Sequence, residues 1–183
     1  MNPSNSRFKA EIVKNVWIGS IFALRELPRN GSEASSHSPW NVITLLSNEK
    51  LLALAGELLG DAPDVTMHRR IIWRIADKID AVFLCDELIR VLDSIDQSIN
   101  SNQPCLVHCV QGRSRSVSVC AAFLLSRKHV TTLEQALDLI RKARPYAKPN
   151  VGFLAALKAI ERERGDVTNA IERWKTKNVD DDK

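Results

Sequence analysis

The sequence is poor in the features that mark membrane, zinc-binding and nucleic-acid-binding proteins. None of its apolar runs approaches the roughly 18 residues that cross a bilayer, so we expect no membrane span. Its four cysteines include no Cys-x-x-Cys pair and no framework spacing, which argues against a zinc site and for reduced thiols. No block of Lys and Arg is dense enough to predict nucleic-acid binding, although the net charge of +4 mildly favours anionic substrates.

We expect neither a secretory signal peptide nor myristoylation at the N-terminus. It has no apolar core of a secretory signal peptide, and Asn2 stands where myristoylation requires glycine. We therefore expect a cytoplasmic or nuclear protein. The length of 183 residues suits one domain with a proper core and is short for two.

Strand-like and helix-like segments alternate along the chain, with a Ser-rich loop expected at Arg29–Pro39. Strands are predicted at Ile12–Val13 and Val16–Gly19 (a hairpin), Val42–Leu46, Val65–Trp73 and Cys105–Val107. Helical segments are predicted at Ile21–Leu27, Glu49–Leu59, Asp77–Asn100, Val117–Leu125, Thr131–Arg144, Val151–Arg164 and Asp166–Lys177. The segment at Thr131 opens with a capping-box pattern that ends at Glu134. This order favours one α/β domain around a mostly parallel sheet.

The stretch His108–Ser116 carries the strongest functional signal. It follows a short apolar strand, leads into a helix and places Cys109 six residues before Arg115. A loop with a glycine that runs into a helix N-terminus points its backbone amides inward, so it suits a phosphate. Gly112 allows that backbone conformation, and the planar fork of Arg115 can bind two phosphate oxygens at once.

The same loop would activate a nucleophile. Its amides and positive charge would stabilise the Cys109 thiolate and lower the thiol pKa, so that the sulfur can attack phosphorus. Ser116 lies where its hydroxyl could donate to that sulfur, and His108 is better placed to brace the loop than to act as a base. The plainer alternative, a buried structural thiol, leaves five residue types at fixed offsets unexplained.

This stretch resembles the His-Cys-x5-Arg-Ser/Thr signature of the cysteine-dependent protein tyrosine phosphatase superfamily, in particular its small dual-specificity branch. The resemblance covers residues 12–162, through Val16–Ser20, Val42–Ser47, Ile75–Asp77 and Arg144–Phe153. It implies the protein tyrosine phosphatase-like α/β fold, with about five mostly parallel strands flanked by helices. It also implies a flexible N-terminus at 1–11, a catalytic domain at 12–165, and a C-terminal helix with an acidic tail at 166–183.

The resemblance assigns roles to individual residues, with no metal and no cofactor. The implied catalytic residues are Cys109, Arg115, Asp77 and Ser116. The implied phosphate-binding residues are Val110, Gln111, Gly112, Arg113, Ser114 and Arg115, and the supporting residues are His108 and Asn150. The chain departs from compact members in the segments 29–39 and 49–65 and at loop positions 111 and 113.

One carboxyl group could protonate the leaving oxygen and then activate the water that hydrolyses the phosphocysteine. Asp77 and Asp80 are both candidates near the start of a predicted helix. Asp77 matches the acid position of the family, whereas Asp80 is more simply a charge at a helix N-terminus. Two other roles stay open: Asn150 is also a natural helix cap, and Arg113 either touches the substrate or is solvated.

The resemblance implies a metal-independent hydrolase that removes phosphate from phosphotyrosine and phosphoserine/threonine in proteins, MAP kinases being one option among the substrates. The tyrosine-specific Lys-Asn-Arg-Tyr element is missing, which implies a shallower pocket. The alternatives are a phosphatase for phosphoinositides or other non-protein substrates, suggested by Arg113, and a weakly catalytic phosphate-binding module. We expect a monomer or weak dimer. Cys85, Cys105 and Cys120 are interpreted as core thiols, one of which could form a protective disulfide with Cys109.

Overall fold

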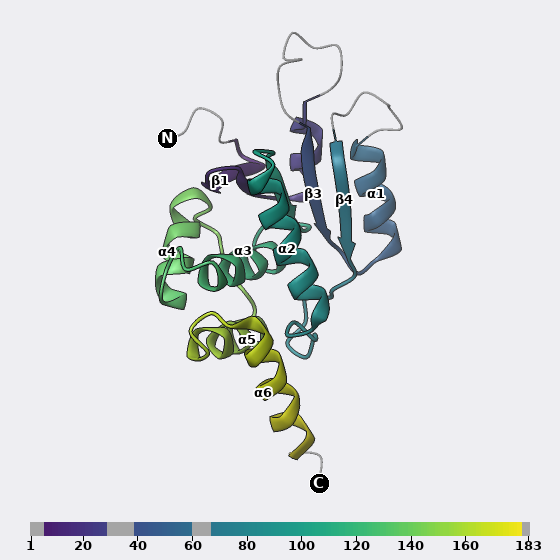
Figure 1. The fold of residues 1–183 in the computed structure, drawn as a ribbon. Coiled ribbons are helices and arrows are strands. Elements are labelled where there is room, and N and C mark those ends of the chain that lie inside the picture. The colour runs from purple at the N-terminus through teal and green to yellow at the C-terminus, as the bar shows by residue number, and fades with distance from the viewer. Residues whose placement is uncertain (1–5, 29–38, 60–66, 181–183) are drawn as a thin grey trace.

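A five-stranded mixed sheet forms the centre of the protein in a computed structural model that describes residues 6–28, 39–59 and 67–180 (Figure 1). The strand order is β1-β2-β5-β3-β4, with β1 antiparallel to β2 and the other neighbours parallel. The strands are β1 (Lys9–Val13), β2 (Val16–Gly19), β3 (Trp40–Leu45), β4 (Met67–Trp73) and β5 (Cys105–His108). This mostly parallel α/β architecture confirms the predicted fold class.

Helices cover both faces of the sheet. One apolar cluster joins the sheet to the short 3-10 helix η1 and to α1, and a larger cluster joins the other face to α2, α3, α4, α5 and α6 (Figure 1). The helices are η1 (Ile21–Glu26), α1 (Glu49–Leu59), α2 (Asp86–Asn100), α3 (Arg115–Ser126), α4 (Leu133–Ala143), α5 (Val151–Arg162) and α6 (Val167–Asp180). Within the described residues, no helix is long and apolar enough to cross a membrane.

The central strand β5 is buried on both faces. Leu106 packs in the cluster with α1, whereas Cys105 and Val107 pack in the cluster with α3. Continuous apolar runs are typical of strands covered on both sides. Because β2 and β3 both lie parallel to β5, the loop that leaves β5 emerges between two neighbouring strand ends, where open α/β sheets bind their ligands.

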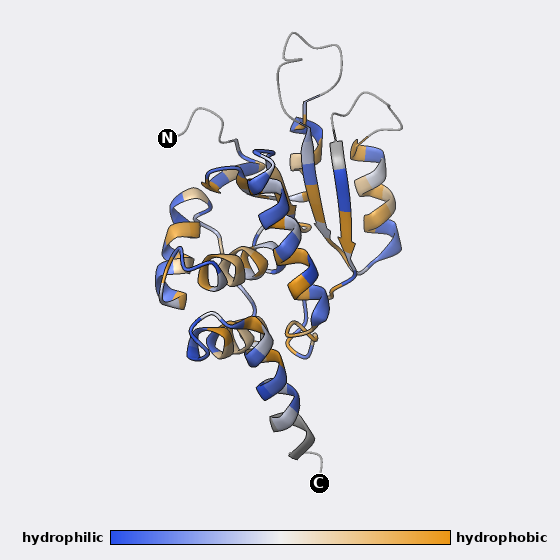
Figure 2. Ribbon diagram, viewed as in Figure 1, coloured by the Kyte–Doolittle hydropathy of each residue, from blue (hydrophilic) through white to orange (hydrophobic). Residues whose placement is uncertain are grey.

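Helix α3 receives that loop and is buried along almost its whole length. Figure 2 shows its ribbon mostly in the hydrophobic colours. Its buried polar residues, Arg115, Ser116 and Ser118, all lie in the first turn or just after it. Polar groups gathered at one end of an otherwise apolar helix indicate a functional role, because buried polar groups cost stability unless they have partners.

The helix predicted over Asp77–Asn100 begins later, at Asp86, so that prediction was wrong at its start. Its pattern included Ile79 and Val82, which the structure leaves 68% and 71% exposed. Residues 74–85 instead form a loop beside the carboxyl end of the sheet, and the amphipathic spacing becomes continuous only from Leu88 onward.

Smaller differences concern the caps and the chain ends. The capping box of α4 pairs Thr132 with Gln135, one residue later than predicted, because the Thr132 side chain accepts the Gln135 amide. Strand β1 begins at Lys9, within the segment 1–11 that was expected to be flexible. The expected loop at residues 29–38 and the start of the predicted strand at 65–66 lie outside the described residues.

Candidate active site

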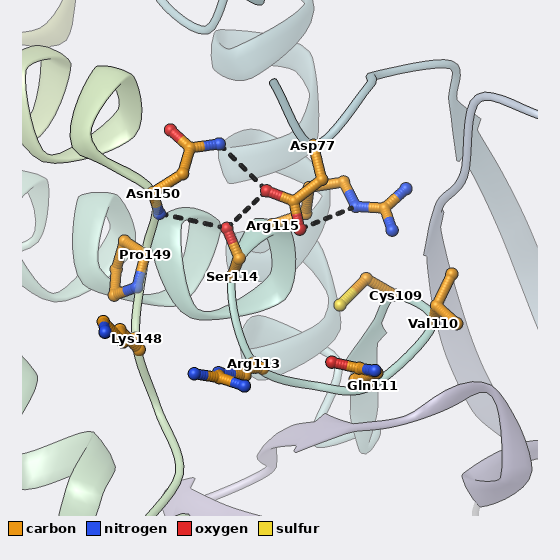
Figure 3. Close-up of a pocket in the computed structure, with 10 residues that line it drawn as sticks. All are labelled: Asp77, Cys109, Val110, Gln111, Arg113, Ser114, Arg115, Lys148, Pro149 and Asn150. Carbon is orange, nitrogen blue, oxygen red and sulfur yellow. Dashed lines mark hydrogen bonds and ion pairs between the residues drawn. The ribbon is translucent and has the colours of Figure 1, made fainter. Parts of the chain in front are cut away.

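The loop between β5 and α3 lines an open cavity of about 540 Å³ (Figure 3). Three separate segments contribute to it: the loop itself, the segment after β4 and the turn before α5. The lining residues are Asp77, Cys109, Val110, Gln111, Arg113, Ser114, Arg115, Lys148, Pro149 and Asn150. Most of the residues predicted for the site therefore share one cavity, although they are up to 73 positions apart in the chain.

Cys109 is 2% exposed, and its sulfur has two polar neighbours. The Gly112 amide donates to Sγ at 3.2 Å, and the Ser116 hydroxyl lies 3.3 Å from Sγ. Burial alone would raise the pKa of this thiol. Hydrogen bonds from the hydroxyl and the backbone amide of Ser116, with the charge of Arg115, outweigh burial and lower the pKa below the ordinary thiol value. The cysteine is thereby prepared as a nucleophile.

Gly112 shapes the loop through its backbone. Its φ of 68° is a left-handed conformation that other residues adopt at a cost. A Cβ atom at this position would also lie 2.7 Å from the carbonyl carbon and oxygen of Gly19 on β2. The close approach of the backbones of Gly112 and Gly19 leaves room for no residue other than glycine. In this conformation the Gly112 amide points toward the sulfur of Cys109.

Arg115 is 6% exposed at the start of α3. Its Nη1 donates to the carbonyl oxygen of Ile75 at 3.4 Å, and its Nε lies 3.9 Å from Oδ2 of Asp77. Among the described residues, Nε has no hydrogen-bond partner. A buried guanidinium with an unused donor beside a cysteine can bind the oxygens of a phosphate, and its planar shape suits two of them.

Asp77 is held over the cavity by two hydrogen bonds to the same oxygen (Figure 3). Oδ1 accepts from the Ser114 hydroxyl at 2.7 Å and from Nδ2 of Asn150 at 2.9 Å. Oδ2 is left on the side of Arg115. Asp80, the other acid candidate, lines a different cavity, between residues 79–85 and the helices α5 and α6. The geometry therefore favours Asp77 as the carboxyl group of this site.

Asn150 has two functions that the sequence had presented as alternatives. Its Oδ1 accepts the Phe153 amide at 2.9 Å as the N-cap of α5. Its Nδ2 donates to Asp77 and, at 3.2 Å, to the carbonyl oxygen of Lys78. Its own amide donates to the Ser114 hydroxyl at 3.2 Å. One side chain thus joins the cap of α5 to the segment that carries Asp77.

His108 is completely buried below the loop. Its Nδ1 lies 3.4 Å from the carbonyl oxygen of Cys109, and its Nε2 lies 2.9 Å from Oγ1 of Thr44 on β3. Burial lowers the pKa of His108 to about 3. A neutral, buried imidazole that contacts the backbone of the loop fits the predicted bracing role.

Sequence reasoning missed several residues around the loop. Lys148 lines the cavity with an exposed side chain, and its amide donates to the carbonyl oxygen of Arg113 at 2.8 Å. Arg144 donates to the carbonyl oxygen of Gln111 at 3.2 Å and is partly buried there. The turn between α4 and α5, with Pro145 and Pro149, was the sequence feature that could have indicated these two residues. Prolines make a turn rigid, and a rigid turn can hold a neighbouring loop in place.

The other cysteines are free thiols: Cys105 and Cys120 are buried in the core as expected, whereas Cys85 is only partly buried at its edge. Burial raises the pKa of Cys105 to about 12 and raises the pKa of Cys120 well above the ordinary thiol value. Both are therefore protonated and unreactive near neutral pH. Within the described ranges, no group of three or more His, Cys, Asp or Glu residues could hold a metal ion.

Comparisons with known proteins agree with this geometry. The family model "Dual specificity phosphatase, catalytic domain" matches residues 62–163, more than half of the chain. Dual specificity protein phosphatase 1 of Arabidopsis thaliana is 34% identical over 134 residues, 72% of this chain and 64% of that protein. Dual specificity phosphatase 28 of Mus musculus is 39% identical over 69 residues, 38% of this chain and 42% of that protein.

The chain thus spans less than two thirds of the length of both relatives. The crystal structure of human DUSP28 has the same fold, with a TM-score of 0.64 and 20% identity, and the match covers 84% of this chain and 96% of that chain. The matched residues include the whole segment from β4 to α5, with the cavity and its cysteine. The chain belongs to the dual specificity phosphatase family and carries its catalytic domain.

Proposed function

We propose that the protein hydrolyses phosphomonoesters through a phosphocysteine intermediate, without a metal, and acts on phosphotyrosine and phosphoserine/threonine in proteins. The observation that carries this proposal is the convergence of Cys109, Arg115 and Asp77 on one cavity. Cys109 and Arg115 stand at the two ends of the loop between β5 and α3, Asp77 comes from the segment after β4, and each has the burial or the partners that its role requires. A module that only binds phosphate would need the guanidinium of Arg115. It would need neither the lowered thiol pKa of Cys109 nor the carboxyl group of Asp77 beside that thiol.

In the first step, the thiolate of Cys109 attacks phosphorus, and the bond between phosphorus and the leaving oxygen breaks. Arg115 and the loop amides bind the phosphate oxygens as their charge redistributes. Asp77 gives its proton to the leaving oxygen, so the product departs as an alcohol or phenol. Since both hydrogen bonds to Asp77 end on Oδ1, we assign this proton to Oδ2.

In the second step, water attacks the phosphocysteine and passes a proton to the Asp77 carboxylate. The bond between phosphorus and sulfur breaks, which releases inorganic phosphate and returns the thiolate. Ser116, 3.3 Å from Sγ, keeps its proton and stabilises the departing thiolate with a hydrogen bond. His108 and Asn150 support these groups without touching the reacting atoms.

The proposed protein substrates follow from the family, and the missing Lys-Asn-Arg-Tyr element supports a pocket shallow enough for the shorter phosphoserine and phosphothreonine side chains. A second candidate, a phosphoinositide phosphatase, is favoured by one observation. Arg113 and Lys148 are both exposed and both line the cavity, so they could bind additional phosphates on an inositol ring. MAP kinases remain one option among the proposed protein substrates.

Hydrolysis of an aryl phosphate tests the chemistry. We expect turnover that EDTA does not reduce, that Cys109→Ser abolishes and that Cys85→Ser, a matched change at a cysteine outside this cavity, leaves intact. Pure, folded protein that binds a phosphopeptide without turnover would refute the proposal. A panel of phosphotyrosine, phosphoserine and phosphothreonine peptides against phosphoinositides then separates the two candidate substrate classes.

A further inference from the structure

Three side chains, on the adjacent strands β4, β3 and β5, form a line of hydrogen bonds that ends at the backbone carbonyl oxygen of Cys109. Arg70 on β4 donates from Nε to Oγ1 of Thr44 on β3 at 3.3 Å. Oγ1 lies 2.9 Å from Nε2 of His108 on β5, and Nδ1 of the same ring lies 3.4 Å from the carbonyl oxygen of Cys109. The sheet register sets Thr44 directly opposite His108, so both side chains project from the same face.

The direction of the hydrogen bonds at His108 follows from the acceptor end of this line and from the single hydrogen of a neutral ring, while Arg70 fills one of the two acceptor sites of the Thr44 hydroxyl. A guanidinium can only donate and a carbonyl oxygen can only accept. His108 is neutral, because burial lowers its pKa to about 3, so the ring carries one hydrogen. That hydrogen must be on Nδ1 to reach the carbonyl oxygen of Cys109. Nε2 therefore accepts from the Thr44 hydroxyl, whose lone pair accepts from Arg70.

The Cys109 carbonyl group also sets the direction of the next amide. In a trans peptide group, the carbonyl and the N–H point to opposite sides. When His108 holds the carbonyl oxygen of Cys109, the N–H of Val110 points away from His108, toward the side on which Val110 lines the cavity. The orientation of this peptide group therefore decides whether the loop offers that amide to a phosphate.

We propose that Arg70 and Thr44 are positioning residues: they hold His108 in its Nδ1–H tautomer and thereby turn the Val110 amide toward the bound phosphate. The inference rests on the proposed function for its meaning, since it concerns how the phosphate is bound. Arg70 acts through Thr44 and His108 and touches neither the substrate nor the sulfur. Its partly buried position on β4 serves this role, and burial lowers its pKa without removing its charge.

The chain offers a matched control for each position. Arg70→Met removes the donor, whereas Arg69→Met changes the adjacent arginine, which points to the other face and bonds Gln97 on α2. Thr44→Val removes the hydroxyl at nearly constant volume, whereas Thr44→Ser keeps it. The groups whose charges act on Cys109, namely Arg115, Arg144 and Cys120, are unchanged in all four variants.

Two measurements test the proposal. Long-range ¹H–¹⁵N NMR spectra of the imidazole rings report the tautomer directly, and we expect only the Nδ1–H form of His108 in the wild type and an added Nε2–H form in Arg70→Met. Competitive inhibition by inorganic phosphate reports the loop amides. We expect the inhibition constant to rise about fivefold in Arg70→Met and Thr44→Val, as for one lost hydrogen bond. In Arg69→Met and Thr44→Ser it should stay within about twofold.

The pH profile of Cys109 alkylation should move little in these variants, because Arg70 does not act on the sulfur. A folded Arg70→Met protein with wild-type phosphate inhibition would overturn the proposal, as would an Nε2–H tautomer in the wild type. The NMR spectra need no turnover, and the wild-type spectrum tests the tautomer without a variant. The Arg70→Met spectrum tests the role of Arg70 even if Thr44→Val fails to fold, and separately from any failure of the proposed function.

Discussion

Asn150 allows the stability of a helix to be separated from the position of the acid. Asn150→Ala removes the N-cap of α5 and the hydrogen bonds to Asp77 and Lys78 together. Asn150→Ser retains a capping hydroxyl, because serine caps helices about as well as asparagine, but its side chain is too short to reach Asp77. Comparison of the two variants assigns each loss to one function.

The expected changes in stability follow from the cap. Loss of an N-cap costs about 1 kcal/mol. In a domain of this size that corresponds to a Tm lower by about 2–4 °C. We therefore expect this decrease in Asn150→Ala and a much smaller one in Asn150→Ser, measured by thermal unfolding followed by circular dichroism.

The expected change in activity follows from Asp77. Asp77 is a protonated, neutral carboxyl group in the first step, and a hydrogen bond to a neutral group contributes about 1 kcal/mol, or about fivefold in rate. Both variants should lose about this factor in kcat/KM on phosphoserine peptides, whose leaving group needs the proton. On an activated aryl phosphate they should lose much less. Equal loss on both substrates, or wild-type rates in Asn150→Ser, would refute the assigned role of Asn150.

Three further predictions concern the loop and its surroundings. Ser116→Ala removes a hydrogen bond that lowers the Cys109 pKa. The acid limbs of the pH profiles of kcat/KM and of alkylation by iodoacetate should therefore move to higher pH by about one unit. An unchanged limb would show that this contact does not lower the Cys109 pKa. Gly152→Ala places a Cβ 1.9 Å from the carbonyl oxygen of Ile79, so it should displace the segment 74–85 that carries Asp77. It should therefore lower kcat more on substrates with poor leaving groups than on activated aryl phosphates. Arg113→Gln should raise KM severalfold for substrates that carry a second anionic group, and leave KM unchanged for aryl phosphates without one. Equal effects on both kinds of substrate would place Arg113 outside substrate recognition.

The sequence predicted the fold class and the cysteine loop because both depend on local patterns. The buried strand β5, Gly112 with its left-handed φ and the apolar helix α3 are read from consecutive residues. The acid candidate Asp77 came from the family resemblance, and the structure adds that Asp80 lines another cavity.

What the sequence could not provide depends on contacts across the sheet. Arg70 and Thr44 are 26 positions apart and become neighbours only through the pairing of β3 with β4. The start of α2 was wrong because the exposed apolar residues Ile79 and Val82 fit helical spacing by chance in a loop. Local periodicity does not reveal that such residues are exposed, since exposure depends on the rest of the fold.

The Ser114 hydroxyl joins three segments that the chain order separates. It donates to Asp77 and accepts the Asn150 amide, while its own residue belongs to the phosphate loop. The side chains of Ser114 and Asn150 both donate to Asp77, so a change of the carboxyl group at position 77 would leave both donors without their partner. Among relatives, the residue type at position 77 should therefore covary with those at positions 114 and 150.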